Sequence, residues 1–259
     1  MERHRRRSRR ATISNEIVHN RRRSALLLAT FVGLVVLVVG LLSLIFHLGW
    51  VPVLAALVLA GLASAASYLY SDRVALALSH ARPVGPDEEP RYHNLVEGLC
   101  IAAGLPKPEL YVVDSPAPNA FATGRSPDHA ALVVTRGLLE RLTRVELEGV
   151  LAHELSHIRR GDILVTTLAV TLLGLLLPLP PLASQLMRLT VSRQRESEAD
   201  LSGVRLTRYP PGLIAALEKL RVDESVVPSG SRATAHLWLE SPRDHRDSLD
   251  ERISALRDL

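Results

Sequence analysis

Residues 146–160 read ELEGVLAHELSHIRR, and this stretch decides how the rest of the chain is interpreted. His153 and His157 are four positions apart, so on a helix both imidazoles lie on one face and can reach a single metal ion. Glu154 stands between them and can contact a water on that ion without being a ligand itself. The alternative is a solvated helix that carries two surface histidines.

The surroundings of this motif favour a buried helix over a solvated one. Apolar residues recur through it at helical spacing: Leu147, Val150, Leu151 and Leu155. An unpaired imidazole is costly in such a setting, and a shared metal ion would satisfy both rings. Thr143 and Glu146 form the sequence signature of a capping box, so we expect the helix to begin there and to continue to about Arg160.

A catalytic zinc ion usually has three protein ligands and keeps its fourth position for water. The third ligand is expected in the stretch SRQRESEAD, residues 192–200, where Glu196 and Asp200 are spaced i and i+4 on a predicted helix. We predict that Glu196 binds one Zn2+ ion per chain and that Asp200 accepts a hydrogen bond from a ligand histidine. The alternatives are Glu198 as the ligand, or a solvated acidic helix face.

The N-terminal part of the chain predicts a membrane hairpin. Residues 24–46 contain no charged side chain, and after the break HLGW a second uncharged stretch covers residues 51–70. Each stretch is long enough to cross a bilayer as a helix. A signal peptide is the alternative, but the length of the first stretch, the second stretch and the lack of a convincing cleavage site argue against it. We therefore expect a transmembrane helical hairpin over residues 24–70.

Charge predicts the orientation of this hairpin. The chain has a formal net charge of +4, and nine of its 31 basic residues are arginines within residues 1–23. Cytoplasmic flanks of membrane spans carry such a bias, so residues 1–23 are interpreted as a basic cytoplasmic tail beside a lipid bilayer, with no nucleic-acid partner. Cys100 is the only cysteine, which excludes an intrachain disulfide and fits a reducing compartment. We expect a multi-pass protein of the cell (inner) membrane whose catalytic domain is cytoplasmic.

Residues 71–259 are predicted to form a single α+β, mostly α, domain. Residues 88–103 have the apolar spacing of a helix. Three short extended pieces, at residues 109–113, 119–123 and 130–135, lie close together in the sequence. They indicate a small antiparallel sheet beside the helix that carries the two histidines.

At this point the chain resembles the HtpX-type membrane metallopeptidases, which are related to the CAAX prenyl proteases and to Oma1-like peptidases. The match covers most of residues 90–255. Five blocks carry it: residues 146–158 around the histidines, Pro118 to Gly124, Glu196-x-x-Ala199-Asp200, and two weaker ones, His236 to Trp238 and Leu249 to Ile253. The third block favours Glu196 over Glu198 as the metal ligand.

The resemblance implies a zincin-like metallopeptidase domain that cleaves membrane or misfolded polypeptides as part of quality control. It also implies that Asn119 and Ala120 lie on an edge strand that pairs with the substrate backbone. Strand addition would explain a broad tolerance for substrate sequence, because main-chain hydrogen bonds supply the affinity. A turn residue after Pro118 is the alternative interpretation of Asn119.

The chain departs from the family pattern in two places. The family's late His-Pro-Pro block stands here as His245-Arg-Asp-Ser, so His245 is expected to help with the oxyanion, to cover the metal, or to be a surface histidine. The hydrophobic insert 163–187 is too short for two complete crossings, and one crossing would separate the ligands across the membrane. We expect residues 163–187 to turn at their prolines and to enter the lipid only shallowly.

Three other kinds of function compete with a quality-control endopeptidase. A CAAX-type prenyl protease is the nearest, but its resemblance implies more membrane spans than this chain offers. A site-2-type intramembrane protease would need a Leu-Asp-Gly motif, and the chain has none. A non-catalytic, metal-stabilised membrane scaffold would have no need for Glu154, because a purely structural zinc site closes its fourth position.

Overall fold

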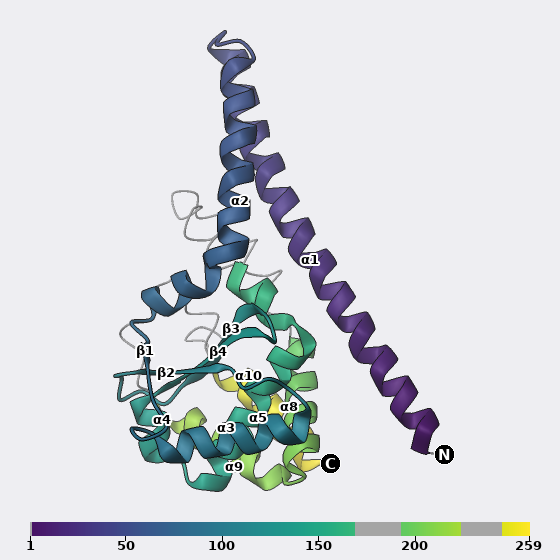
Figure 1. Cartoon of the computed structure of the whole chain (residues 1–259), viewed down its shortest axis with the longest axis vertical. Helices are drawn as coiled ribbons and strands as arrows, with labels where there is room; N and C mark the ends of the chain where they lie inside the picture. Colours follow the sequence, from purple (N-terminus) through teal and green to yellow (C-terminus); the bar gives the residue numbers. More distant parts are fainter. Residues whose placement is uncertain (1, 169–192, 224–244) are drawn as a thin grey trace.

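The computed structural model describes residues 2–168, 193–223 and 245–259. Figure 1 shows a long helical hairpin that leads into a domain of helices around a small sheet. The elements follow in the order α1 Glu2–Ile45, α2 Val51–Leu78, β1 Arg82–Pro83, α3 Pro90–Ala103, β2 Glu109–Val113, β3 Ala120–Ser126, β4 His129–Thr135, α4 Arg136–Arg141, α5 Arg144–Arg160, α8 Arg193–Thr207, α9 Pro210–Val222 and α10 His245–Arg257. The predicted fold class, mostly α with a small sheet behind two apolar helices, is confirmed.

Helices α1 and α2 form the predicted hairpin. Both pass the length and composition expected of membrane spans, Ser24–Ile45 with a mean hydropathy of 2.9 and Val51–Leu78 with 1.9. Most side chains of these stretches are exposed, as lipid-facing residues are. The turn between the helices uses left-handed backbone at His47 and Gly49. Helix α2 continues past the expected end at residue 70 and delivers the chain to β1.

The sheet has four strands in the order β1-β2-β4-β3. It is mixed, whereas the sequence predicted a wholly antiparallel sheet: β3 and β4 form an antiparallel hairpin, but β2 pairs with β4 in parallel. The reason is that the chain after β2 bypasses the neighbouring position, forms the outer strand β3, and then returns as β4. Strand β3 therefore lies at the edge of the sheet, as the resemblance implied.

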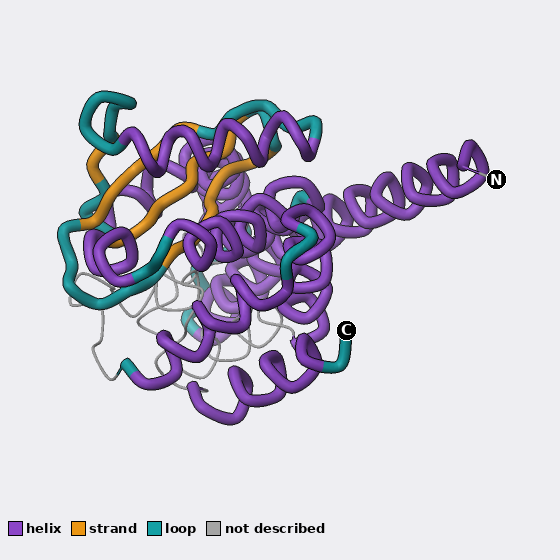
Figure 2. The backbone as a smooth tube through the Cα atoms, turned by 90° about the horizontal axis from the view of Figure 1, so that it is seen from below, coloured by secondary structure: helices purple, strands orange, loops and turns teal. Residues whose placement is uncertain are grey.

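The two faces of the sheet are covered by different parts of the molecule. Alternate residues of β4 point to opposite faces, as in any strand. Val133 joins Phe121 and Ala75 of α2 in one apolar cluster. The alternate residues Ala130, Leu132 and Val134 join the main core instead, which α3, α5 and α9 complete. Figure 2 shows the strands gathered at one side of the domain with helices packed against them.

Helix α5 is the central element of the domain, and its ends follow the predicted signals. Thr143 and Glu146 form the capping box at its start. Gly161 ends it in the left-handed conformation with a φ of 71°. Five of its apolar side chains are essentially inaccessible to solvent: Leu147, Val150, Leu151, Leu155 and Ile158. The helix is therefore held rigidly in the core, and residues 162–168 continue as a further helical segment beyond Gly161.

Candidate metal centre

The two histidines of α5 project side by side from one face of the helix. The Nε2 atoms of His153 and His157 are 3.2 Å apart, and the ring centroids are separated by 4.8 Å in an edge-to-face arrangement. His153 is completely buried, while His157 retains slight exposure. The predicted i, i+4 geometry thus brings two ring nitrogens close enough to bind one metal ion.

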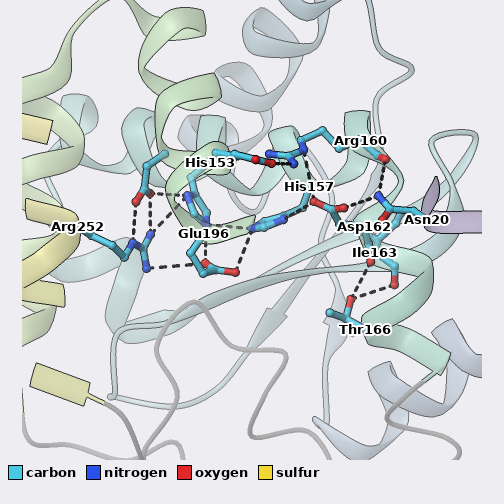
Figure 3. A network of polar contacts seen from close by, with 11 residues as sticks. Asn20, His153, His157, Arg160, Asp162, Ile163, Thr166, Glu196 and Arg252 are labelled. Carbon is cyan, nitrogen blue, oxygen red and sulfur yellow. Dashed lines mark hydrogen bonds and ion pairs between the residues drawn. The ribbon is translucent and has the colours of Figure 1, made fainter. Parts of the chain in front are cut away.

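Glu196 reaches this point from α8. One of its carboxylate oxygens is 3.5 Å from Nε2 of His153, and the other is 3.8 Å from Nε2 of His157. Across the described ranges 2–168, 193–223 and 245–259, these three residues form the cluster whose donor atoms could hold a metal ion, all within 4.8 Å of one another. Figure 3 shows the carboxylate of Glu196 turned toward both rings.

Close packing of the two helices makes this approach possible. Gly203 lies about two turns after Glu196 on the same face of α8 and rests against the backbone of α5. A Cβ atom at position 203 would be 2.9 Å from the backbone nitrogen of His153 and 3.1 Å from its Cα. Any larger residue would push α8, and Glu196 with it, away from the histidines.

The other nitrogen of each ring is held by a carboxylate. His153 Nδ1 is 2.8 Å from an oxygen of Asp200, and His157 Nδ1 is 3.3 Å from an oxygen of Asp162. Ionised carboxylates only accept hydrogen bonds, so both rings donate through Nδ1, and each ring presents a lone pair at Nε2 when it is neutral. Two neutral rings whose lone pairs face each other at 3.2 Å would repel, and either a proton on one ring or a cation between them removes the repulsion.

The dimensions of the cluster fit a tetrahedral metal ion. Zinc binds imidazole nitrogen and carboxylate oxygen at about 2.0–2.2 Å, which places neighbouring tetrahedral ligands roughly 3.3 Å apart. The three observed separations, 3.2, 3.5 and 3.8 Å, bracket that value. Three ligands with a fourth position left over are the pattern of a catalytic zinc site rather than of a structural one.

Arg252 of α10 fixes the partner of His153. Its guanidinium donates twice to Asp200, with both nitrogen–oxygen distances at 2.7 Å, and it is buried along with the carboxylate. A third nitrogen of Arg252 lies 3.8 Å from Glu196. The resemblance had placed Arg252 only in a weak block near the end of the chain, so its contact with Asp200 is a finding of the structure.

The buried charges of the centre strongly perturb one another. Burial alone would lower the pKa of His153, but Asp200 and Glu196 outweigh it and raise that pKa to about 9 in the metal-free site. Burial works against ionisation of Glu196 and Asp200 as well. Both histidines and Arg252 nevertheless hold the pKa of Glu196 well below its usual range, and Arg252 and His153 lower the pKa of Asp200. The site is therefore built to keep its carboxylates charged.

Glu154 has the opposite environment. It is nearly completely buried on α5 between the two histidines, and burial raises the pKa of its carboxyl above the ordinary value. A carboxylate with a raised pKa holds a proton more readily, which is what a general base needs when it takes a proton from water.

The competing ligand of the sequence prediction lies elsewhere. Glu198 pairs with the guanidinium of Arg160 and accepts a hydrogen bond of 2.9 Å from Gln194. Both contacts hold its carboxylate apart from the ring nitrogens, and it is not a member of the His153, His157 and Glu196 cluster. The structure thus brings Glu196, and not Glu198, to the histidines.

Asn119 and Ala120 lie at the beginning of the edge strand β3. The backbone of Asn119 faces β4, where its oxygen accepts from the amide of Thr135 at 2.9 Å. The amide of Ala120 points the other way, toward the outer edge, and donates to the side chain of Asn119 at 3.0 Å. Asn119 is therefore a strand-end residue whose own side chain occupies the first outward-facing amide of β3.

Two further predictions fall largely outside the described residues. His245 is the first residue of α10, but the position of its side chain is not described. Of the hydrophobic insert 163–187, only residues 163–168 are described, and they are helical. Shallow insertion of residues 163–187 into lipid and a role for His245 stay predictions, and His236 to Trp238 also lie outside the described ranges.

Sequence reasoning missed Asp162. This residue follows Gly161 and belongs to neither the His motif nor the Glu196 motif. The available signal was its position just after the end of α5, close in sequence to the second histidine of the candidate site. Burial alone would raise the pKa of Asp162, but the hydrogen bond and charge of His157, together with the nearby charge of Arg160, outweigh burial and hold that pKa below its ordinary value.

Comparison with known proteins points to one family. Residues 86–259 match the family model described as "Peptidase family M48". A protein named "Protease HtpX homolog" from Tropheryma whipplei (strain Twist) is 41% identical over 207 residues, which is 68% of this chain and 71% of that protein. Proteins of the same name from Dictyoglomus thermophilum and Aquifex aeolicus are 35% and 36% identical over 263 and 250 residues. These alignments cover 89% and 82% of this chain, and 87% and 81% of those proteins.

Proposed function

Since the chain belongs to the HtpX-type group of peptidase family M48 and is thus a membrane-associated metalloprotease, we propose that it is a zinc-dependent endopeptidase of the membrane. The observation that carries the proposal is the convergence of His153, His157 and Glu196, from two helices, on a point with tetrahedral dimensions. His153, His157 and Glu196 are the proposed ligands of one Zn2+ ion. Asp200 is the proposed partner that orients His153.

The proposed reaction adds water across an internal peptide bond. A bound zinc ion supplies Lewis acidity, polarising the scissile carbonyl and lowering the pKa of the attacking water toward 7. Glu154 takes the proton from that water as the new carbon–oxygen bond forms. The same carboxyl then gives the proton to the amide nitrogen as the carbon–nitrogen bond breaks, so a carboxylate and an amine leave.

We propose that the substrate is an extended polypeptide bound along β3. The outward-facing backbone of this strand begins at Ala120, whose amide is held by Asn119 until a substrate strand replaces it. Helix α5 packs against β3, so a strand added at this edge would run beside Glu154 and the histidines. His245 is retained as a candidate for contact with the oxyanion or the metal.

The proposal includes the organisation and location suggested by the sequence. Residues 1–23 would be a basic cytoplasmic tail, residues 24–70 a transmembrane hairpin, and residues 71–259 the peptidase domain with the hydrophobic insert 163–187. The domain would work on the cytoplasmic side of the cell (inner) membrane. Membrane proteins or misfolded proteins would then be the substrates, as expected for quality control.

Replacement of the proposed base tests the activity. Purified wild-type protein and Glu154→Gln, both loaded with zinc, are incubated with casein and checked for self-cleavage. We expect Glu154→Gln to keep its zinc and to lose at least about a hundredfold in rate, because proton transfer alone contributes 10²–10⁴-fold. Equal rates in the two proteins would contradict the proposal and leave a metal-stabilised scaffold.

A matched control and a second substrate sharpen this experiment. Glu148→Gln makes the same change on the same helix at a residue that lines a surface pocket with Val145, Thr207 and Tyr209, so it should keep wild-type activity. A farnesylated peptide with a C-terminal CAAX sequence is offered beside casein. Preference for the farnesylated peptide would favour the CAAX-type alternative over a general endopeptidase.

A further inference from the structure

A buried contact links the first membrane helix to the metal centre. Asn20 of α1 is only 6% exposed, and its amide nitrogen donates to an oxygen of Asp162 at 2.5 Å and to the backbone oxygen of Arg160 at 3.1 Å. Asn20 lies four residues before the span Ser24–Ile45 begins. Figure 3 shows it reaching the site from α1, on the far side of Asp162 from His157.

The two carboxylate oxygens of Asp162 contact different partners, one Asn20 and the other His157. One oxygen accepts the amide of Asn20, and the other is 3.3 Å from Nδ1 of His157 and 3.6 Å from Nε of Arg160. Asp162 is 2% exposed, so little water is available to replace either partner. The rotation of this carboxylate, and with it the direction of the His157 ring, therefore depends on Asn20.

The contact belongs to a continuous face of α1. Four buried residues follow one another at intervals of four, three and four positions: Asn20, Ser24, Leu27 and Phe31. This spacing places them on one side of a helix. Leu27 and Phe31 pack with Val165, three residues beyond Asp162, and with Ala60 of α2. The segment that carries Asp162 is thus held by α1 along several helical turns, which gives Asn20 a defined place.

We propose that Asn20 is a positioning residue for the metal centre. It fixes Asp162, Asp162 fixes the imidazole of His157, and the membrane hairpin thereby contributes to the geometry of the metal ligands as well as to anchoring. The inference rests on the proposed zinc site. The amide of Asn20 donates to one oxygen of Asp162 and adds no charge, while the guanidinium of Arg160 lies 3.6 Å from the oxygen that faces His157.

Zinc affinity of the full chain in lipid nanodiscs tests this role. Asn20→Leu preserves the size of the side chain and removes the donated hydrogen bond. Loss of a side chain that hydrogen-bonds a metal ligand typically lowers metal affinity by about 10–100-fold, so Asp162→Asn should lower the zinc affinity by roughly that factor. Asn20→Leu acts one contact further away and should lower the zinc affinity by about three- to tenfold. Competition with a chelator measures both. The visible spectrum of the cobalt-substituted protein should shift in both variants, because it reports ligand geometry rather than folding.

A matched control separates positioning from packing. Ser24 lies one turn along the same buried face of α1, and its hydroxyl has no hydrogen-bond partner within the described ranges. Ser24→Ala should leave both the zinc dissociation constant and the cobalt spectrum unchanged. The double variant Asn20→Leu/Asp162→Asn should bind zinc about as well as Asp162→Asn alone, because the two residues act through one carboxylate.

The outcomes distinguish this inference from the proposed function. Wild-type protein that binds no zinc would overturn the zinc site, and the role of Asn20 with it. A zinc-binding wild type with unchanged affinity and unchanged cobalt spectrum in Asn20→Leu would overturn only the role of Asn20. Fully additive losses in the double variant would do the same, since they would show that Asn20 acts independently of Asp162.

Discussion

At the scale of residues, the centre is made by pairing each ring with a carboxylate on its outer side. Asp200 and Asp162 take the Nδ1 atoms of His153 and His157, and this leaves both Nε2 atoms free to meet Glu196. The two carboxylates are secured in different ways, one by the guanidinium of Arg252 and the other by Asn20. Metal affinity is therefore expected to depend on side chains that never touch the ion.

The assignment of the third ligand makes a direct prediction. Glu196→Ala removes the only carboxylate that the structure brings to the two Nε2 atoms in its described part, so the protein should lose nearly all bound zinc. Glu198→Ala removes a partner of Arg160 instead and should retain about one zinc per chain. Mass spectrometry of metal content measures both. The reverse pattern would show that Glu198 is the ligand.

The titration of His153 predicts how pH acts on the metal-free protein. Its folded pKa of about 9 lies above the value of about 6.5 in an unfolded chain, so the protonated ring stabilises the fold. This stabilisation is complete below about pH 6.5 and is lost as the pH rises through 9. The melting temperature of metal-free protein in detergent should therefore fall between pH 6.5 and 9.

Zinc should reverse that trend. The ion must displace the proton from His153, which becomes easier as pH rises. The increase in melting temperature on adding zinc, at free concentrations set by a chelator buffer, should thus be larger at pH 9 than at pH 6.5. An increment that shrinks over this range would mean that the ring is already unprotonated in the metal-free fold.

At the scale of elements, the separation of α5 and α8 controls the site. Gly203 allows α8 to lie directly on the backbone of His153, and Gly149 allows a similar approach of α9 at Leu213. Neither glycine has a positive φ, so glycine is needed at both positions because it has no side chain to separate the helices. This contact between helices therefore sets how closely Glu196 approaches the two histidines.

Gly203→Ala tests that dependence. The added Cβ would sit 2.9 Å from the backbone nitrogen of His153, so we expect a loss of about 1–3 kcal/mol in the free energy of unfolding, together with weaker zinc binding. Gly98→Ala is the control, because it adds the same atom on α3 with nothing within 4 Å. That change should stabilise by roughly 0.5–1 kcal/mol. Thermal denaturation with and without zinc measures both, and equal effects would contradict the packing argument.

The success of sequence reasoning depended on how local each feature is. His153, His157 and the Thr143 cap were predicted because the geometry of a single helix relates residues three and four positions apart. The edge position of β3 came from the resemblance. The sequence predicted an antiparallel sheet and missed the parallel pairing of β2 with β4, since strand order is set by contacts between distant segments. Asn20 and Asp162 are separated by 142 positions, and no periodic pattern connects them.

At the scale of the whole molecule, the hairpin and the domain are joined by more than a linker. Residues of α1 pack beside Asp162, and the end of α2 covers one face of the sheet through Ala75. Figure 1 shows α2 running directly into the domain. The proposed active centre should therefore sit at a defined height below the bilayer, close to the base of the hairpin.

Labelling of single cysteines tests the proposed orientation. Leu48 in the hairpin turn is 57% exposed and Leu259 at the other end is 67% exposed, whereas the native Cys100 is buried. A membrane-impermeant maleimide should label Leu48→Cys in right-side-out vesicles and Leu259→Cys in inside-out vesicles. Labelling of Leu259→Cys in right-side-out vesicles would place the domain on the non-cytoplasmic side.

The reach of Arg252 has a consequence for biosynthesis. This guanidinium meets Asp200 and approaches His153 across 99 positions of the chain, and it arrives on α10, which is translated last among the described helices. A nascent chain on the ribosome therefore displays its histidines and Glu196 well before Asp200 is clamped. If Glu154 is the base and Asp200 orients His153, as proposed above, we expect hydrolytic activity to mature only after α10 has packed against α8.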